Sequence, residues 1–296
     1  MKVSHCTALL VGAIAVVPTL RAQSLFDRAR SASDRGQVDS AYELIQLAAD
    51  AEPGRAEVQW LLGEIACRKA GSAGPIDAFT LARKCKAAFA RAVELAPDSL
   101  TYLEGLANYL SQAPGIAGGD KDSALKLAGL VRQRDDARGD LLTANLLWSG
   151  DAAAKARADS LAEGALGRHP TDRLVQLRAG AWWASTNRPE RALAVYEGMV
   201  ARDPQDPIAR FFVGRQLVLL RRNLRRAQEH LRFAAAAPAP PAGAQSFTPG
   251  APWYRLGQSY VQLGMSDSAR ICFEQALKIN PQLQPARLSL DSLSRP

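Results

Sequence analysis

The chain has 296 residues, of which 47% are hydrophobic and 22% are charged, and its formal net charge is +8. That length allows a substantial buried interior, in one elongated domain or in two compact ones. The positive charge favours contact with acidic surfaces, but nucleic-acid binding is not expected because aromatic RNA-reading motifs are absent.

Residues 1–22 are expected to be a secretory signal peptide, which would make the protein periplasmic or secreted. Lys2 supplies a positive start, the 13 residues Ala8–Leu20 carry no charge, and Ala22 is a small residue at the cleavage position. The uncharged run is shorter than the ~20 apolar residues of a membrane-spanning helix, and the rest of the sequence offers no other candidate span. An uncleaved amphipathic or anchoring N-terminus is the alternative.

From Ser24 onward the apolar spacing is helical almost throughout, and strand signals are nearly absent. One helix–turn–helix pattern recurs, with a first helix, a turn, and a second helix that carries an apolar stripe and usually ends at a proline. The stripes of the first three copies are Ala41, Ile45 and Ala48, then Cys85, Phe89 and Ala92, then Ala124, Ala128 and Val131.

The second and third copies are longer than the others. Glycine-rich stretches at 69–75 and 114–120 predict enlarged loops between their helices. Glycine permits the backbone angles that let a long loop fold back between two helices.

The next three copies are closer to one another in length, and Pro170 and Pro204 end two of them 34 residues apart. Gly180 and Gly214 are small residues on first helices, and Asn223 is a plausible turn residue. The stripes of these copies are Ala158, Ala162 and Ala165, then Ala192, Tyr196 and Met199, then Ala227, Leu231 and Ala234.

Residues 238–252 are rich in Pro, Gly and Ala and are expected to form a loop or hinge. A final copy follows, in which Leu256 and Tyr260 lie one helical turn apart and Gly257 lets a second helix approach closely. Residues 285–293 are expected to form a short capping helix over the last apolar face. The positions that define the final copy are Trp253, Leu256, Gly257, Tyr260, Ala269, Phe273, Ala276 and Pro281.

Those eight positions resemble the consensus of the tetratricopeptide repeat (TPR) family, a 34-residue helix–turn–helix unit. The resemblance extends over residues 24–281, and the 114–120 insertion is similar to one in exported bacterial members. It implies an all-α solenoid, a right-handed superhelix of about seven repeats, two of them with enlarged loops. The chain then divides into a signal peptide (1–22), repeats one to six (23–237), the loop (238–252), and the final repeat with its capping helix (253–296).

No catalytic residue, cofactor or metal site is expected. His169 ends a repeat and His230 adjoins the buried Leu231, so both favour structural or solvated roles. Nucleophile-elbow, zinc-helix and Cys-x-x-Cys motifs do not occur. Residues 115–121 approximate a phosphate-binding loop, but Asp120 occupies a required glycine position and no strand precedes it.

After signal cleavage the cysteines are Cys67, Cys85 and Cys272, so at least one thiol is free or paired between chains in an oxidising compartment. Cys67 and Cys85 belong to one hairpin, and a disulfide between them is one alternative. Their expected orientations disfavour it, because Cys67 should face the groove and Cys85 its partner helix. The other alternative is three small buried apolar residues.

The resemblance also implies a concave groove lined by first-helix side chains that lie off the packing stripe. Aromatic and arginine side chains are the usual anchors of binding energy, although Trp60 and Phe211 are large enough to be covered between repeats instead. The predicted groove residues are Trp60, Glu64, Arg68, Glu104, Asn108, Leu177, Phe211, Arg215, Tyr254 and Gln258.

A basic patch is a second candidate surface, formed by Arg221, Arg222, Arg225 and Arg226. It is either a solvated helix end or a dock for acidic groups. The function expected from these features is a non-catalytic protein-interaction scaffold of the bacterial cell envelope, which binds an extended peptide or a helix in the groove. The alternative is an envelope protein whose arginine patch binds a polyanion, such as a phosphate-bearing lipid headgroup or a cell-wall polymer.

The signal peptide leads to a direct prediction. N-terminal sequencing of the exported protein should give a first residue near Gln23, because Ala22 suits the peptidase. A mature protein that begins at Met1 would contradict cleavage and favour an anchored N-terminus.

Overall fold

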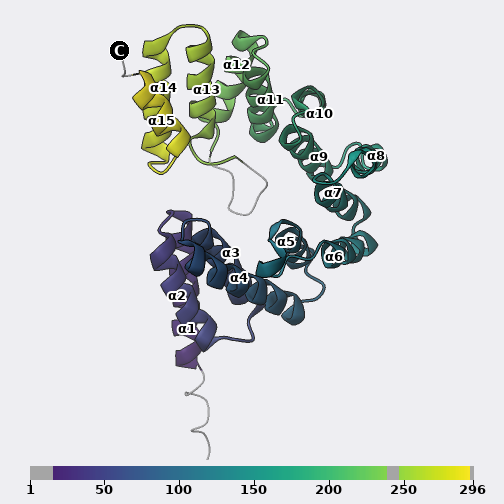
Figure 1. The fold of residues 1–296 in the computed structure, drawn as a ribbon. Coiled ribbons are helices and arrows are strands. Elements are labelled where there is room, and N and C mark those ends of the chain that lie inside the picture. Colours follow the sequence, from purple (N-terminus) through teal and green to yellow (C-terminus); the bar gives the residue numbers. More distant parts are fainter. Residues whose placement is uncertain (1–15, 239–246, 294–296) are drawn as a thin grey trace, which may run out of the picture. The chain divides into compact units, whose positions relative to one another are not determined.

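A computed structural model describes residues 16–238 and 247–293, and its regular elements over those ranges are fifteen α-helices and one 3-10 turn (Figure 1). The chain divides into two compact units, one up to Val131 and one from Arg132 onward. Most of the expected signal peptide lies outside the described residues. None of the described helices is long and apolar enough to cross a membrane.

The first unit contains α1 (Val16–Asp34), α2 (Val38–Ala51), α3 (Ala56–Ala70), α4 (Pro75–Leu95), α5 (Leu100–Gln112), the 3-10 turn η1 (Gly115–Ala117) and most of α6 (Lys121–Arg134). The second contains α7 (Asp136–Leu147), α8 (Ala152–Arg168), α9 (Arg173–Ser185), α10 (Pro189–Arg202), α11 (Pro207–Leu219), α12 (Leu224–Ala236), α13 (Ala251–Gln262), α14 (Ser266–Ile279) and α15 (Gln284–Leu293). Helices α1 to α14 make seven consecutive helix–turn–helix pairs, which confirms an all-α helical-repeat fold of the predicted size.

The second helix of each pair buries the stripe that the sequence predicts. All of the predicted stripe residues, from Ala41 in the first pair to Ala276 in the last, are buried. Because the stripes recur at helical spacing, each second helix presents one continuous apolar side. Within each unit this side can pack on the partner helix and on the next pair, as α2 does with α1 and α3.

Four first helices carry a glycine where the second helix of the pair places a large side chain. A β-carbon at any of these glycines would lie within 2.6 Å of that side chain. The glycine therefore sets how closely the two helices of the pair approach. The four contacts are Gly63 with Phe89, Gly180 with Tyr196, Gly214 with Leu231, and Gly257 with Phe273.

The two insertions are accommodated differently. In the third pair, residues 113–120 form the expected loop, which contains η1 and has Gly118 at a φ of +87°. In the second pair, only residues 71–74 link the helices, and the insertion lengthens α4 to 21 residues. The enlarged loop predicted at 69–75 is therefore a helix extension, since Pro75 fits the first turn of a helix and the residues after it are compatible with one.

The capping roles of two predicted turn residues are visible in the structure. Asn223 adopts a left-handed conformation with a φ of +41° and caps α12 by accepting a hydrogen bond from the backbone N–H of Arg226. Asp120 accepts hydrogen bonds from the backbone N–H and the hydroxyl of Ser123, at 3.0 and 2.6 Å, at the start of α6. Asp120, which stands where a phosphate-binding loop would require glycine, therefore acts as a helix cap.

The connection before the final pair lies partly outside the described residues, which omit 239–246. Helix α13 begins at Ala251, slightly before the predicted boundary at 253, because Pro252 is tolerated in a first turn. The predicted capping helix is present as α15, which packs on α14 and buries Ala286.

The contact between Gly257 and Phe273 leads to a stability prediction. Gly257→Leu should lower the free energy of unfolding by about 1–3 kcal/mol, because the new side chain must displace the Phe273 ring. Denaturant unfolding would measure the change. Gly167→Leu is the matched control, since no atom lies within 4 Å of a β-carbon there and leucine favours the helix. An unchanged midpoint for Gly257→Leu would contradict the register of the last pair.

Candidate functional site

The first unit contains a hollow of about 800 Å³ between α3, α4, α5 and η1, which we call the apolar hollow. Its walls include the aromatic rings of Trp60, Phe79, Phe89 and Tyr109. Phe79 is 38% exposed and Ile116, on η1, is 82% exposed. Two large apolar side chains therefore stand open to solvent at a concave surface, as expected of a binding site rather than of a covered core.

Trp60 lies at the junction between the second and third pairs. Its indole packs against Phe89 at 4.8 Å and Tyr102 at 5.0 Å, measured between ring centroids. A β-carbon at Gly105 would overlap the indole, so this glycine makes room for it. Trp60 thus combines the two roles left open by the sequence, because it is half-buried between repeats and also lines the apolar hollow.

The glycine-rich insertion of the third pair forms part of the wall. The Tyr109 hydroxyl lies 2.7 Å from the carbonyl oxygen of Ala82 on α4 and 2.8 Å from that of Ala117 on η1. Burial raises the pKa of Tyr109, so the group stays a neutral phenol. Tyr109 ties α4, α5 and η1 together and fixes the position of the Ile116 side of the hollow.

The polar residues predicted for the first unit divide into two groups. Glu64 and Asn108 line the apolar hollow, whereas Arg68 and Glu104 do not. Glu64 is an exposed residue, yet desolvation of its carboxyl raises the pKa. The nearby charges of Arg68 and Arg30 lower this pKa, but desolvation has the larger effect. Arg68 donates hydrogen bonds to the Ser33 carbonyl oxygen at 3.0 Å and hydroxyl at 2.9 Å, so it serves the contact between α3 and α1.

A disulfide joins Cys67, which also lines the apolar hollow, to Cys85 on α4. The expected orientations of Cys67 and Cys85 do not prevent this bond, because α3 and α4 pack so closely that the two Cα atoms are 5.3 Å apart. Cys272 is a free, buried thiol, and burial raises its pKa to about 11. Cys272 is the one cysteine of the three that fits the description of a small buried apolar residue.

The second unit has a smaller pocket of about 300 Å³ between the first helices α11 and α13, which we call the arginine pocket. The predicted groove residues Phe211, Arg215 and Tyr254 line it. Arg255 lines it as well, although the sequence analysis did not include it. Its position next to Tyr254 did not predict a shared pocket, since adjacent residues along a helix point in different directions.

Two residues predicted to face a partner are instead buried. Leu177 is 2% exposed within the core of the second unit, and Phe211 is 4% exposed. The Phe211 ring is covered by Phe247 at 4.6 Å and Phe212 at 5.2 Å, measured between centroids. The prediction of Leu177 as an exposed groove residue was wrong, and Phe211 follows the open alternative in which a large apolar side chain is covered.

The basic patch is not uniform. Arg221, Arg222 and Arg225 are exposed at the turn between α11 and α12. Arg226 is half-buried and forms an ion pair with Glu197 on α10, at 2.6 Å. Three arginines are therefore available at the surface, while the fourth links two pairs of helices.

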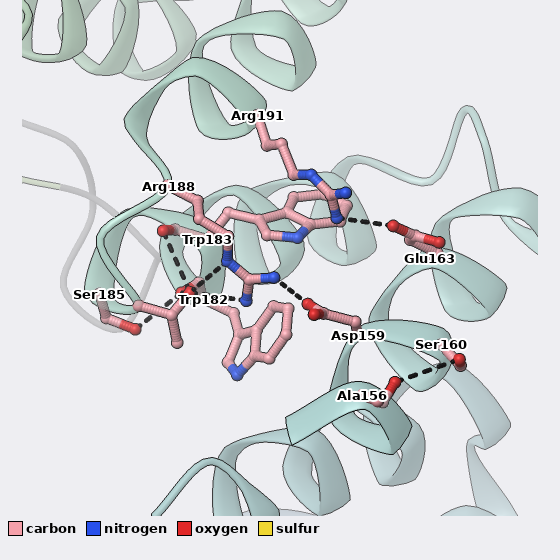
Figure 2. A network of polar contacts seen from close by, with 10 residues as sticks. Ala156, Asp159, Ser160, Glu163, Trp182, Trp183, Ser185, Arg188 and Arg191 are labelled. Carbon is pink, nitrogen blue, oxygen red and sulfur yellow. Dashed lines mark hydrogen bonds and ion pairs between the residues drawn. The ribbon is translucent and has the colours of Figure 1, made fainter. Parts of the chain in front are cut away.

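A network at the start of α10 was also missed by the sequence analysis, and Figure 2 shows it. The Arg188 guanidinium lies 4.5 Å from the ring centroids of both Trp148 and Trp182 and is paired with Asp159. Arg191 pairs with Glu163 at 2.6 Å beside it. Because Arg188 has aromatic faces, a carboxylate and the Thr186 hydroxyl as partners, it joins the α7–α8 and α9–α10 pairs and has a structural role.

Both histidines have structural surroundings in the second unit. His169 ends α8, and its Nε2 lies 2.9 Å from Asp136 Oδ1. His230 is buried on α12, where desolvation lowers its pKa and the charges of Arg210 and Arg226 lower it further.

Comparison with known proteins identifies the repeat. Residues 251–283 match the model of the tetratricopeptide repeat family. The chain has the fold of a TPR protein. TPR proteins are in general non-catalytic scaffolds for protein interactions. A search of the curated proteins gives no significant match.

Several solved structures share this TPR fold. A TPR protein from Parabacteroides merdae is 14% identical with a TM-score of 0.50, and the match covers 93% of this chain and all of that one. A monomeric IFIT1 mutant with m7Gppp-AAAA is 16% identical with a TM-score of 0.55, covering 93% of this chain and 68% of that one. Human IFIT1 with PPP-AAAA is 19% identical with a TM-score of 0.53, covering 86% and 59%. At these identities the likeness is one of fold.

The disulfide leads to a second stability prediction. Replacing both Cys67 and Cys85 with alanine should lower the free energy of unfolding by about 2–4 kcal/mol, because the unfolded chain loses a closed loop. A reductant should destabilise the unaltered protein by a similar amount and leave the double variant unchanged. Titration of thiols in denatured mature protein should find Cys272 alone, so a count of three would contradict the bond.

Proposed function

We propose that this chain is an exported, non-catalytic scaffold of the bacterial cell envelope, periplasmic or secreted, which binds a protein partner. The partner segment is an extended peptide or a helix held in the apolar hollow, against residues of α3, α4, α5 and η1. The observation that carries this proposal is the apolar hollow, in which Phe79 and Ile116 are exposed beside the half-buried Trp60.

The hollow suits binding because its walls are fixed before a partner arrives. Trp60 is wedged between two rings, Tyr109 ties three elements together, and the disulfide joins α3 to α4. A preformed surface lowers the entropic cost of association, since few of its own side chains must become ordered.

The chemistry of the walls describes the part of the partner that enters. Apolar walls favour an apolar or aromatic anchor side chain, which gains free energy by leaving water. Glu64 adds one acceptor near these walls, suited to a backbone N–H or a cationic side chain of the partner. A helix or an extended peptide each presents such anchors at regular intervals.

Export is a proposal that two features support. The N-terminal sequence has the pattern of a signal peptide, and disulfides persist mainly in oxidising compartments outside the cytosol.

Polyanion binding at the basic patch is the second candidate function, favoured by the exposure of Arg221, Arg222 and Arg225. A polyanion would meet these three charges without first breaking an ion pair, whereas Arg226 is already paired with Glu197. Such binding would be electrostatic and would weaken steeply as salt rises.

Crosslinking in the native envelope tests the proposed function. A photo-crosslinking residue at Ile116 should capture one protein partner, and a Phe79→Glu variant should lose that capture, because a buried charge opposes an apolar anchor. Ile271→Glu is the matched control, since Ile271 is an exposed residue of α14 and 58% accessible. It should leave capture unchanged while both variants stay folded.

Equal capture by the Phe79→Glu and Ile271→Glu variants would contradict the hollow as the partner site. The second candidate function is tested by retention on anionic vesicles. Loss of retention in a variant that combines Arg221→Gln, Arg222→Gln and Arg225→Gln would favour polyanion binding at the basic patch.

A further inference from the structure

The arginine pocket brings two guanidinium groups from different repeats to one place. Arg215 comes from α11 and Arg255 from α13, and both line the same pocket. Burial lowers the pKa of Arg255, and the charge of Arg215 lowers it further. Two like charges in a partly desolvated pocket are unfavourable unless something of opposite charge joins them.

The existing partners of these arginines are neutral. Arg255 donates a hydrogen bond from Nη1 to Gln258 Oε1 at 2.7 Å and lies 5.2 Å from the Tyr254 ring centroid. Gln258 in turn donates to the Tyr254 hydroxyl at 2.8 Å. The Nε–H of Arg215 is buried and has no hydrogen-bond acceptor among the described residues. The pair is thus held in position while its charge stays uncompensated.

No carboxylate of the surrounding sequence is placed to neutralise the pair. Between Pro207 and Gln262 the one acidic residue is Glu229, on α12, and it does not line the pocket. No acidic residue is among the described residues that line the pocket. The acids just before this stretch have other partners, since Asp206 pairs with Arg173 and Asp203 accepts from the Gln205 backbone N–H. An anion from another molecule would therefore complete this site.

Aromatic side chains make up four of the eight other residues that line the pocket. Phe211, Phe212, Phe247 and Tyr254 surround the two arginines, and Phe212 also stacks on Tyr196 at 4.8 Å. Aromatic faces favour an apolar or aromatic group next to the anion, while a bare inorganic anion would leave them uncovered.

We propose that the arginine pocket binds an oxyanion, a carboxylate or a phosphate, carried on an apolar or aromatic body. The two guanidiniums donate to the oxygens, since their planar forks match carboxylate and phosphate geometry, and the rings cover the body. This site is separate from the apolar hollow, and its test is independent of the proposed function.

Titration with four small probes tests the chemistry directly. In full-length mature protein carrying ¹⁵N-arginine, benzoate or phenyl phosphate should shift the Nε–H resonances of Arg215 and Arg255. Benzamide, the neutral analogue of benzoate, should leave them unchanged, and inorganic phosphate should bind at least about tenfold more weakly than phenyl phosphate. Which of the two anionic probes binds more tightly identifies the oxyanion as a carboxylate or a phosphate.

Variants tie the binding to these two residues. Arg215→Gln and Arg255→Gln should each weaken binding of the better probe by about tenfold or more, because a charge-assisted hydrogen bond is lost. Arg222→Gln is the matched control, since it removes an exposed arginine that lies outside the pocket. Arg255→Lys keeps the charge without the planar fork and should also weaken binding, which protects the test if a glutamine variant fails to fold.

Three results would overturn the proposal. Benzamide binding as tightly as benzoate would show that the rings alone attract the probe. Equal weakening by Arg222→Gln would show general charge attraction. Equal binding of inorganic phosphate and phenyl phosphate would show that the site does not recognise an apolar body.

Discussion

The contact between a glycine on a first helix and a large side chain on its partner is the constraint on which the repeats depend. It recurs with Phe89, Tyr196, Leu231 and Phe273 as the large member. Because the glycine admits the side chain to the depth of the backbone, the two helices of each of these four pairs lie at a fixed close distance. The remaining faces of a pair are then covered by the neighbouring pair of the same unit.

Close packing within pairs also explains where binding surfaces arise. Large first-helix side chains such as Phe211 are packed inward, so they form pocket walls and not exposed anchors. An open concave surface survives where the regular spacing is interrupted. In the first unit the lengthened α4 and the η1 insertion provide Phe79 and Ile116 as walls, and in the second unit α11 and α13 leave two arginines facing one pocket.

The sequence predicted the fold well because the packing stripes depend on local periodicity, which is visible along the chain. Every stripe residue is buried as expected, and Asn223 caps its helix. The binding surfaces were less predictable because they depend on which neighbour covers a given side chain. Leu177 was expected on the surface and Phe211 either there or covered between repeats, whereas Arg255 and Arg188 acquire their surroundings from other repeats. The Cys67–Cys85 bond stayed one of two alternatives for the same reason, since it depends on the distance between two helices.

The length of α4 sets the direction in which side chains near its start face, relative to Cys85 and Phe89. Helix α4 has 21 residues and α14 has 14, so the second helix of the second pair is 7 residues longer (21 − 14). Seven residues are close to two helical turns at about 3.6 residues per turn, so the added turns stay in phase with Cys85 and Phe89. A single-residue deletion in the first half of α4 would turn Phe79 by about 100° relative to Cys85 and take it off the wall of the hollow. The wall of the hollow therefore depends on the length of α4 as well as on the residues that it carries.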